Sequence, residues 1–216
     1  MRLTIRPELR IIYPRAAFGS LQVRGAVNTK RSDTLEAEKR TLEEKIRSYP
    51  DSREDDVVQG YAEYFSRWGK TYPIEYQIRS LKAGRGLPRV SVLVDCMFMA
   101  ELKNRTLTSG HDLDAVEGEP LFDVSDEGEE YVKLNGEVQV LPRGDVVLRD
   151  GMGVLASVLY GPARRTSIGS STVNSLYFAW CPAGMGDEAV LGHLGDIERY
   201  LSLVYGHVDT EATLHR

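Results

Sequence analysis

The residues of this chain that could do chemistry most directly lie around one histidine. His111 follows Ser109 and Gly110 and precedes Asp112 in the run Ser-Gly-His-Asp-Leu-Asp. An imidazole with an unperturbed pKa near about 6.5 can orient or deprotonate a water molecule. Glycine permits close approach of a backbone N–H, so Gly110 could donate to a developing oxyanion. The run could therefore support attack of water on a carbonyl carbon.

A second candidate segment begins at the turn Tyr160-Gly161 and continues to the basic pair Arg164-Arg165. Gly161 could present another backbone N–H to an oxyanion. Arg164, Arg165 and Thr166 could hold phosphates and a ribose, because a guanidinium fork matches phosphate oxygens. The same arginines could instead be an exposed loop pair without a ligand.

The histidine segment has two plainer interpretations. Asp112 could cap a backbone amide in a turn while His111 satisfies a carbonyl. As a metal site, His111, Asp112 and Asp114 would lack further ligands, because the sequence offers no second cluster. We therefore expect no metal and no cofactor.

Composition narrows the class of protein. The chain has 216 residues, no apolar run of membrane-spanning length and no apolar core of a signal peptide near its start, so we expect a cytoplasmic protein without a membrane partner. Its two cysteines, Cys96 and Cys181, lie in apolar segments and are expected to be buried thiols.

The net charge of −5 argues against non-specific coating of nucleic acid. Positive charge is nevertheless concentrated before the first long helix and again between Arg67 and Arg89, whereas Asp112 to Glu130 is acidic. This asymmetry fits one face that meets an RNA backbone, or ordinary surface charge, and charge alone does not decide between them.

Hydrophobic periodicity predicts the elements that position these residues. Helical spacing predicts helices over about 34–48, 57–68 and 187–204, and Pro73 with the glycines after Lys82 indicates a short helix over 73–82. Periodicity does not separate a buried strand from a buried helix over 90–102, but the length of this apolar segment favours a helix. Short apolar stretches near Ile11 and over 21–27 suit strands, and alternation predicts strands over 121–124, 131–134, 138–141, 146–148, 154–159 and 176–180. Ser109-Gly110 is read as a turn. The aromatic face of 57–68 is expected to lie in the core, and not to stack on bases.

Helices followed by strands and a closing helix predict an α+β fold, with mixed or antiparallel sheets flanked by helices. We expect one unit over 1–207, comprising a mainly helical half (about 1–108), a strand-rich half (about 109–186) and a closing helix (about 187–205). Residues 208–216 are expected to form a frayed tail.

Three motifs carry a resemblance to a known family. Asp112-x-Asp114-x-x-Glu117-Gly118, Gly144-Asp145-Val146-Val147 and Tyr160-Gly161-Pro162 occur in the order found in the B3/B4 domain of the bacterial phenylalanyl-tRNA synthetase beta chain. The chain more closely resembles the freestanding proteins built on that domain. The likeness is best from about Leu93 to Trp180.

In the synthetase this domain hydrolyses wrongly charged aminoacyl-tRNA. The resemblance therefore implies a deacylase that acts in trans on the aminoacylated 3′ end of tRNA. His111, Gly110 and Gly161 would serve the reaction. The residues expected to bind substrate are Glu101, Ser109, Asp112, Tyr160 and Phe178, and those expected to contact RNA are Arg164, Arg165 and Thr166.

The chain departs from the synthetase at two pocket positions. Ser109 stands where the synthetase has its pocket histidine, and Phe178 where it has its pocket glutamate. An aromatic ring in place of a carboxylate would change the amino acid selected. Two other functions stay open: an RNA-binding module that has lost the reaction, and a small amino-acid-binding protein. The oligomeric state is not predicted.

Overall fold

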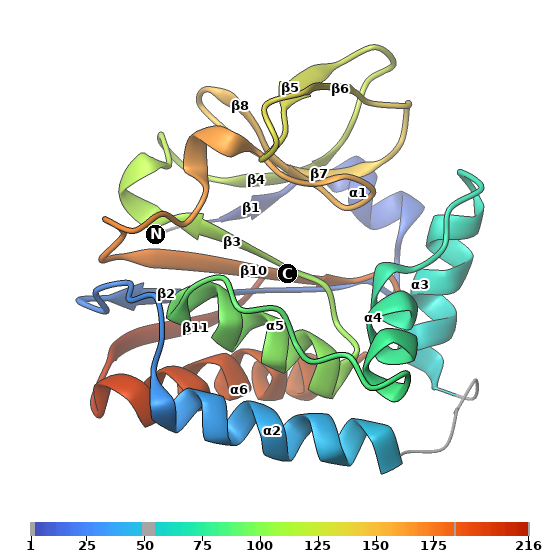
Figure 1. The fold of residues 1–216 in the computed structure, drawn as a ribbon. Coiled ribbons are helices and arrows are strands. Elements are labelled where there is room, and N and C mark those ends of the chain that lie inside the picture. The colour runs from blue at the N-terminus through green and yellow to red at the C-terminus, as the bar shows by residue number, and fades with distance from the viewer. Residues whose placement is uncertain (1–2, 49–54, 184, 216) are drawn as a thin grey trace.

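A four-stranded antiparallel sheet forms the middle layer of the molecule (Figure 1). The computed structural model describes residues 3–48, 55–183 and 185–215. In spatial order the strands are β11 (Asp209–His215), β2 (Ala17–Arg24), β10 (Ser175–Cys181) and β3 (Thr108–Asp112). All seven residues of β10 are buried, because helices cover one face of this sheet and a second sheet covers the other.

The helical layer consists of α2 (Asp33–Ser48), α5 (Val92–Asn104) and α6 (Asp187–Tyr205). Close packing fixes it on the sheet. Tyr177 of β10 donates its hydroxyl to the Leu93 carbonyl of α5 at 3.1 Å. A Cβ atom at Gly19 of β2 would lie 2.5 Å from the Val190 side chain of α6, so only glycine permits this approach.

The second sheet lies on the opposite face of the middle layer. Its order is β1 (Thr4–Ile5), β4 (Leu121–Val124), β7 (Val146–Asp150), β8 (Gly153–Ser157) and β9 (Gly161–Pro162). Strand β1 runs parallel to β4, and the other pairs are antiparallel. The hairpin of β5 (Glu130–Val132) and β6 (Val138–Val140) sits above it. Phe122 of β4 joins the two sheets, since its ring lies 5.0 Å from that of Phe18 and 6.0 Å from that of Phe178.

Helices α3 (Asp56–Ser66) and α4 (Pro73–Lys82) close one end of the layers, and α1 (Pro7–Ile12) lies beside the second sheet. Two 3₁₀ turns, η1 (Leu113–Ala115) and η2 (Arg164–Thr166), complete the described elements. Tyr61, Tyr64 and Phe65 of α3 are buried. The prediction that this aromatic face belongs to the core is confirmed.

The predicted fold class and the five predicted helices are confirmed, each within a few residues. The segment over 90–102, apolar nearly all round, forms α5 and buries Asp95. That carboxylate is satisfied by Lys39 at 2.5 Å and by the Val90 backbone N–H at 2.9 Å. Cys96 and Cys181 are buried free thiols, as expected. No helix in the described residues is both long and apolar enough to cross a membrane.

Three local predictions are wrong. Ile11 and Ile12 end helix α1, which begins at Pro7, where proline's fixed φ favours a helix start. Ser109-Gly110 is part of strand β3, because β10 offers it a buried partner strand. The tail is not frayed: Asp209–His215 pairs along β2 as strand β11.

Candidate functional site

A cavity of about 100 Å³ lies between the two sheets. We call it the inter-sheet cavity. Its volume has room for several water-sized groups. Its lining residues are Leu107, Thr108, Ser109, Phe122, Leu148, Ala156, Ser157, Val158, Gly161, Pro162, Phe178 and Trp180. Most of these side chains are apolar, and none is charged.

Strand register explains which side chains reach this cavity. Ser109 of β3 is paired with Phe178 of β10, so the two side chains lie on the same face of the middle sheet. Alternation puts Trp180 on that face too. Gly110 has the opposite orientation: a Cβ atom there would lie 3.0 Å from the Met97 sulfur of α5. Gly110 therefore packs against the helical layer and does not line the inter-sheet cavity, contrary to its expected catalytic placement.

His111 lies beside the cavity but is sealed from solvent, with an exposed fraction of 0%. Its Nδ1 atom is 2.9 Å from the Thr166 hydroxyl, and its ring lies edge-on to Phe178 at 5.9 Å. Burial lowers the pKa of His111 to about 3, and the nearby Arg165 guanidinium acts in the same direction. The structure thus gives this imidazole neither the ordinary pKa nor the solvent exposure from which its role as a base was expected.

A buried carboxylate stands behind the cavity wall. Asp145 is fully buried and accepts hydrogen bonds from the hydroxyls of Ser157 and Tyr64, the latter at 2.5 Å. Burial raises the pKa of Asp145 to about 6. The Ser157 oxygen also accepts the Tyr160 backbone N–H at 3.1 Å. Because its proton is directed to Asp145, Ser157 can act only as a further acceptor.

Trp180 also contributes a polar group to the residues that line the cavity. It is almost completely buried, and its Nε1 atom has no hydrogen-bond partner among the described residues. Its ring packs edge-on against Tyr61 and Tyr64, at 6.1 and 4.8 Å between centroids. An indole N–H is a donor only, and a buried donor without an acceptor is costly. The packing of this ring therefore leaves one buried donor unsatisfied.

Two predicted substrate-binding residues lie outside the cavity. Glu101 is buried in α5 and accepts the Thr108 backbone N–H at 2.6 Å, and burial raises its pKa to about 8. Asp112 accepts the Asp114 backbone N–H at 3.1 Å and the Thr172 hydroxyl at 2.7 Å. Each carboxylate thus anchors a neighbouring segment, as the plainer interpretation of the histidine turn expected for Asp112.

The segment after β8 is held by contacts within the protein. The Lys70 ammonium lies 4.4 Å from the centre of the Tyr160 ring. Arg165 donates to both carboxylate oxygens of Asp150 and to the Gly153 carbonyl. Thr166 is fully buried against His111, so phosphate cannot reach it. Of the three residues predicted to contact RNA, only Arg164 is exposed without an ion pair among the described residues.

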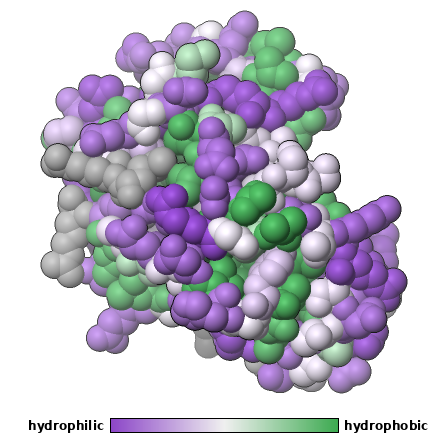
Figure 2. Space-filling view, turned by 90° about the vertical axis from the view of Figure 1, so that its left-hand side faces the viewer, coloured by the Kyte–Doolittle hydropathy of each residue, from purple (hydrophilic) through white to green (hydrophobic). Residues whose placement is uncertain are grey.

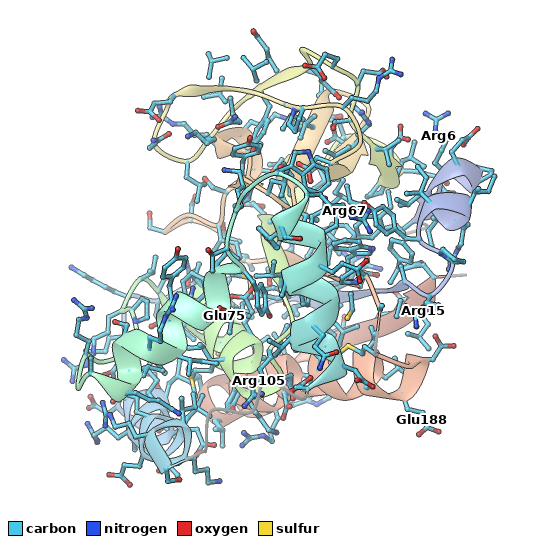
Figure 3. The ribbon with its side chains drawn as sticks, turned by 90° about the vertical axis from the view of Figure 1, so that its right-hand side faces the viewer. Arg6, Arg15, Arg67, Glu75, Arg105 and Glu188 are labelled. Carbon is cyan, nitrogen blue, oxygen red and sulfur yellow. The ribbon has the colours of Figure 1, made fainter. Side chains whose placement is uncertain are left out.

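The end of the molecule closed by α3 carries Arg6, Arg15, Arg67 and Arg105, with Glu75 and Glu188 among them (Figure 3). Arg6 pairs with Asp123 at 3.0 Å and Arg105 with Asp55 at 3.1 Å, which neutralises part of this charge. On the face shown in Figure 2, hydrophobic side chains lie in separate groups among hydrophilic ones.

The structure therefore gathers Ser109, Gly161 and Phe178, from three separate segments, around one cavity. His111 touches its wall, while Gly110, Glu101, Asp112, Arg165 and Thr166 serve packing or loop anchoring. Sequence reasoning missed Ser157 and Trp180 and the role of Asp145. A signal for Asp145 was present, since a carboxylate next to the buried run Val146-Val147-Leu148 needs partners.

No protein-family model matches the chain, and no curated protein matches it. The fold is similar to the crystal structure of an N-terminal fragment of the phenylalanyl-tRNA synthetase beta-subunit from Pyrococcus horikoshii. The TM-score is 0.51 at 13% identity, over 99% of this chain and 50% of that one. The chain thus spans about half the length of that fragment. At this identity the likeness establishes the fold alone, and it confirms the fold that the resemblance predicted.

Proposed function

We propose that this protein is an aminoacyl-tRNA deacylase that acts in trans and binds the amino-acid side chain in the inter-sheet cavity. The observation that carries the proposal is that Ser109, Gly161 and Phe178 converge on one cavity. The sequence motifs and the resemblance indicated all three as site residues. The fold likeness to a phenylalanyl-tRNA synthetase beta-subunit fragment agrees with the sequence resemblance from which this reaction is expected.

The cavity can position the ester and bring it close to the protein backbone, and ester hydrolysis requires both. Its apolar walls can hold a side chain, which fixes the ester relative to the protein. Gly161 has a positive φ of 86° and no Cβ atom, so a substrate can approach the backbone closely there. Ser109, half-buried at the cavity, has a hydroxyl that can orient an attacking water. The aminoacyl ester is itself activated, so positioning can replace a strong general base.

The flanks of residues 158–162 offer positive charge to the tRNA end. Lys70 lies on the Tyr160 ring, and Arg164 follows two residues after Pro162 and is exposed. We assign the contact with the tRNA end to Lys70 and Arg164. Arg165 pairs with Asp150, and Thr166 is buried against His111. Phosphate contacts of this kind weaken steeply as salt concentration rises.

The proposal is tested by incubating the purified protein with tRNAs that carry correct and incorrect labelled amino acids, and following ester loss. We expect selective loss from some mischarged tRNAs, and a slower rate for the double variant Lys70→Ala, Arg164→Ala. The double variant Lys45→Ala, Arg40→Ala, at exposed positions of α2, is the matched control. Loss no faster than spontaneous hydrolysis across the whole panel would refute the proposal.

One observation favours a second candidate, an RNA-binding module of the same fold without catalysis. His111, the expected base, is sealed and its pKa is about 3. This candidate predicts tRNA binding that weakens with salt and no turnover. A filter-binding titration run beside the deacylation panel separates the two, because only the deacylase releases amino acid.

A further inference from the structure

Helix α4 and the loop that follows it form a basic segment on the surface. Residues 70–89 contain five lysines and arginines and one glutamate, whereas the whole chain has a net charge of −5. Arg89 pairs with Glu36 at 2.8 Å. Arg79 and Arg85 are exposed, and neither has an acidic partner among the described residues. Two arginines on this surface thus keep their charge available to a partner.

Tyr76 and Arg79 lie one turn apart on the exposed face of α4. Tyr76 is 57% exposed, and the Arg79 guanidinium lies 4.7 Å from the centre of its ring. Contact with the ring restricts the motion of the arginine, while its N–H groups stay open to a ligand. The pair therefore presents a positioned guanidinium beside an exposed phenol hydroxyl.

The loop over 83–90 is held from beneath by buried carboxylates. Glu43 of α2 accepts the Leu87 backbone N–H at 2.7 Å, and Asp95 of α5 accepts that of Val90 at 2.9 Å. Both carboxylates are buried. The loop backbone is therefore fixed to two helices, and these negative charges do not reach its outer surface.

Arg85 is the exposed arginine of this loop that lacks an ion pair among the described residues. Its backbone N–H donates to the Ser80 carbonyl at 3.1 Å, and its Nε atom lies 2.9 Å from the Ser80 hydroxyl. The Arg47 guanidinium donates to the Arg85 carbonyl at 3.2 Å. These bonds hold the arginine at its backbone and at Nε, and leave its two terminal nitrogens to a ligand.

We propose that Tyr76, Arg79 and Arg85 bind the phosphate backbone of the tRNA acceptor stem, beyond the 3′ end that the inter-sheet cavity receives. We call these three residues the α4 basic face. The inference rests on the proposed function, because it extends the tRNA contact assigned to Lys70. It adds a second contact, which holds the body of the RNA and not its acylated end.

The position of α4 suits this second contact. The helix begins three residues after Lys70, whose ammonium lies 4.4 Å from the centre of the Tyr160 ring. Its ten residues make it about 15 Å long. Figure 3 shows α4, which carries Glu75, at the same end of the molecule as α3. The α4 basic face is therefore close enough to the cavity for one tRNA to contact both.

The residue types of the α4 basic face fit an RNA backbone. A guanidinium fork matches the oxygens of a phosphate, and a tyrosine hydroxyl can donate to a phosphate or a ribose. Contacts with the backbone position a nucleic acid without reading its sequence. The α4 basic face would thus supply affinity for tRNA in general, while the cavity distinguishes the acyl groups.

The test is the binding of uncharged tRNA to the full chain, measured by fluorescence anisotropy at several salt concentrations. The double variant Arg79→Gln, Arg85→Gln should bind at least about tenfold more weakly at low salt. The slope of log K against log salt concentration should become shallower by about 2, one for each phosphate contact removed. The double variant Arg15→Gln, Arg24→Gln makes the same charge change at exposed positions elsewhere and should bind like wild type.

A short substrate separates the α4 basic face from the cavity. At subsaturating concentration, the Arg79→Gln, Arg85→Gln protein should hydrolyse a mischarged tRNA about tenfold more slowly than wild type, because the lost contact is lost from the transition state too. It should hydrolyse the corresponding aminoacyl ester of adenosine, which lacks the stem, at the wild-type rate. Circular dichroism establishes that each variant is folded.

Unchanged tRNA affinity in the Arg79→Gln, Arg85→Gln protein would overturn the inference. So would an equal loss in the Arg15→Gln, Arg24→Gln control, or binding by wild type to vesicles of anionic phospholipid and not to tRNA. The deacylation panel decides the proposed function separately. If tRNA binding depends on the two arginines and no ester is lost, the α4 basic face stands and the deacylase falls. Ester loss with unchanged tRNA binding reverses that outcome.

Discussion

The sequence suggests His111 as a general base, but the structure buries it in the core. Because its pKa is lowered from about 6.5 to about 3, the unfolded chain binds a proton more readily than the folded one. Its contribution to stability is therefore complete above pH 6.5 and is lost as the pH falls through that value toward 3. The residue thus influences pH dependence through folding.

We predict that wild type loses about 2 kcal/mol of unfolding free energy between pH 7.5 and pH 5 relative to His111→Leu. Urea unfolding of both proteins at the two pH values measures this difference. Other buried titratable groups, such as Asp145, are present in both proteins and cancel. His207→Gln, at an exposed position, should behave like wild type. A difference that does not change with pH would mean that His111 is accessible to protons in the folded state.

Phe178 forms part of the wall of the inter-sheet cavity and is nearly fully buried. Phe178→Ala should lower the unfolding free energy by about 3–5 kcal/mol and enlarge the cavity, so that bulkier aminoacyl esters are cleared. Phe65→Ala removes an equally buried ring away from the cavity and should cost similar stability without widening selectivity. Unchanged selectivity in Phe178→Ala would remove Phe178 from the side-chain site.

Some of the residues that line the cavity could be predicted from the sequence and others could not. Gly161 could be predicted from its glycine turn, and Ser109 and Phe178 because the resemblance places them at two pocket positions of the synthetase. Trp180 could not be predicted as a cavity residue, because an indole in an apolar strand ordinarily indicates core packing. Only the packing of the two sheets places it in the cavity wall. The ion pair between Arg165 and Asp150 could not be predicted, because the sequence does not show which residues lie beside each other in the fold.

At the scale of elements, β11 shows how a short segment acquires structure from a distant partner. The stretch Asp209–His215 has weak hydrophobic patterning, yet it pairs with β2 from Phe18 to Arg24. His215 Nε2 lies 2.8 Å from the Ser20 hydroxyl, and Gln22 donates to Glu211 at 3.1 Å. The strand covers an edge of the middle sheet that would otherwise offer unpaired backbone groups.

A chain that stops after Val208 should therefore melt at a lower temperature and associate through the exposed edge of β2. Thermal denaturation and size-exclusion chromatography measure the two effects. Asp209→Asn, an exposed change at the start of β11, should leave both unaltered. If the shortened chain keeps its melting temperature and stays monodisperse, β11 contributes nothing to the edge.

The long amphipathic helices were predictable because a 3.6-residue period over several turns is a strong local signal. The meander strands β4, β7 and β8 were predictable from alternation and glycine turns. Strand β3 was not, because Ser109-Gly110 reads locally as a turn. Its conformation comes from the long-range pairing with β10, and such pairing overrides local preference.

At the scale of the whole molecule, the layers explain why a site can exist at this position. The helical layer of α2, α5 and α6 covers one face of the middle sheet. The cavity lies on the other face, between the middle sheet and the second sheet. Cavity residues therefore come from strands far apart in sequence, β3, β4, β7, β8, β9 and β10. In the proposed function, the inter-sheet cavity holds the side chain of an aminoacyl ester.

The most direct test is the rate of ester loss from a panel of mischarged tRNAs with wild type and Ala156→Leu. Ala156 lines the cavity, so the added carbon atoms fill it. Ala37→Leu, on the exposed face of α2, is the control. We predict that wild type and Ala37→Leu clear the same subset of tRNAs, and that Ala156→Leu, still folded, clears them at least about tenfold more slowly. Equal clearance by all three proteins, or by none above the spontaneous rate, would contradict hydrolysis at the inter-sheet cavity.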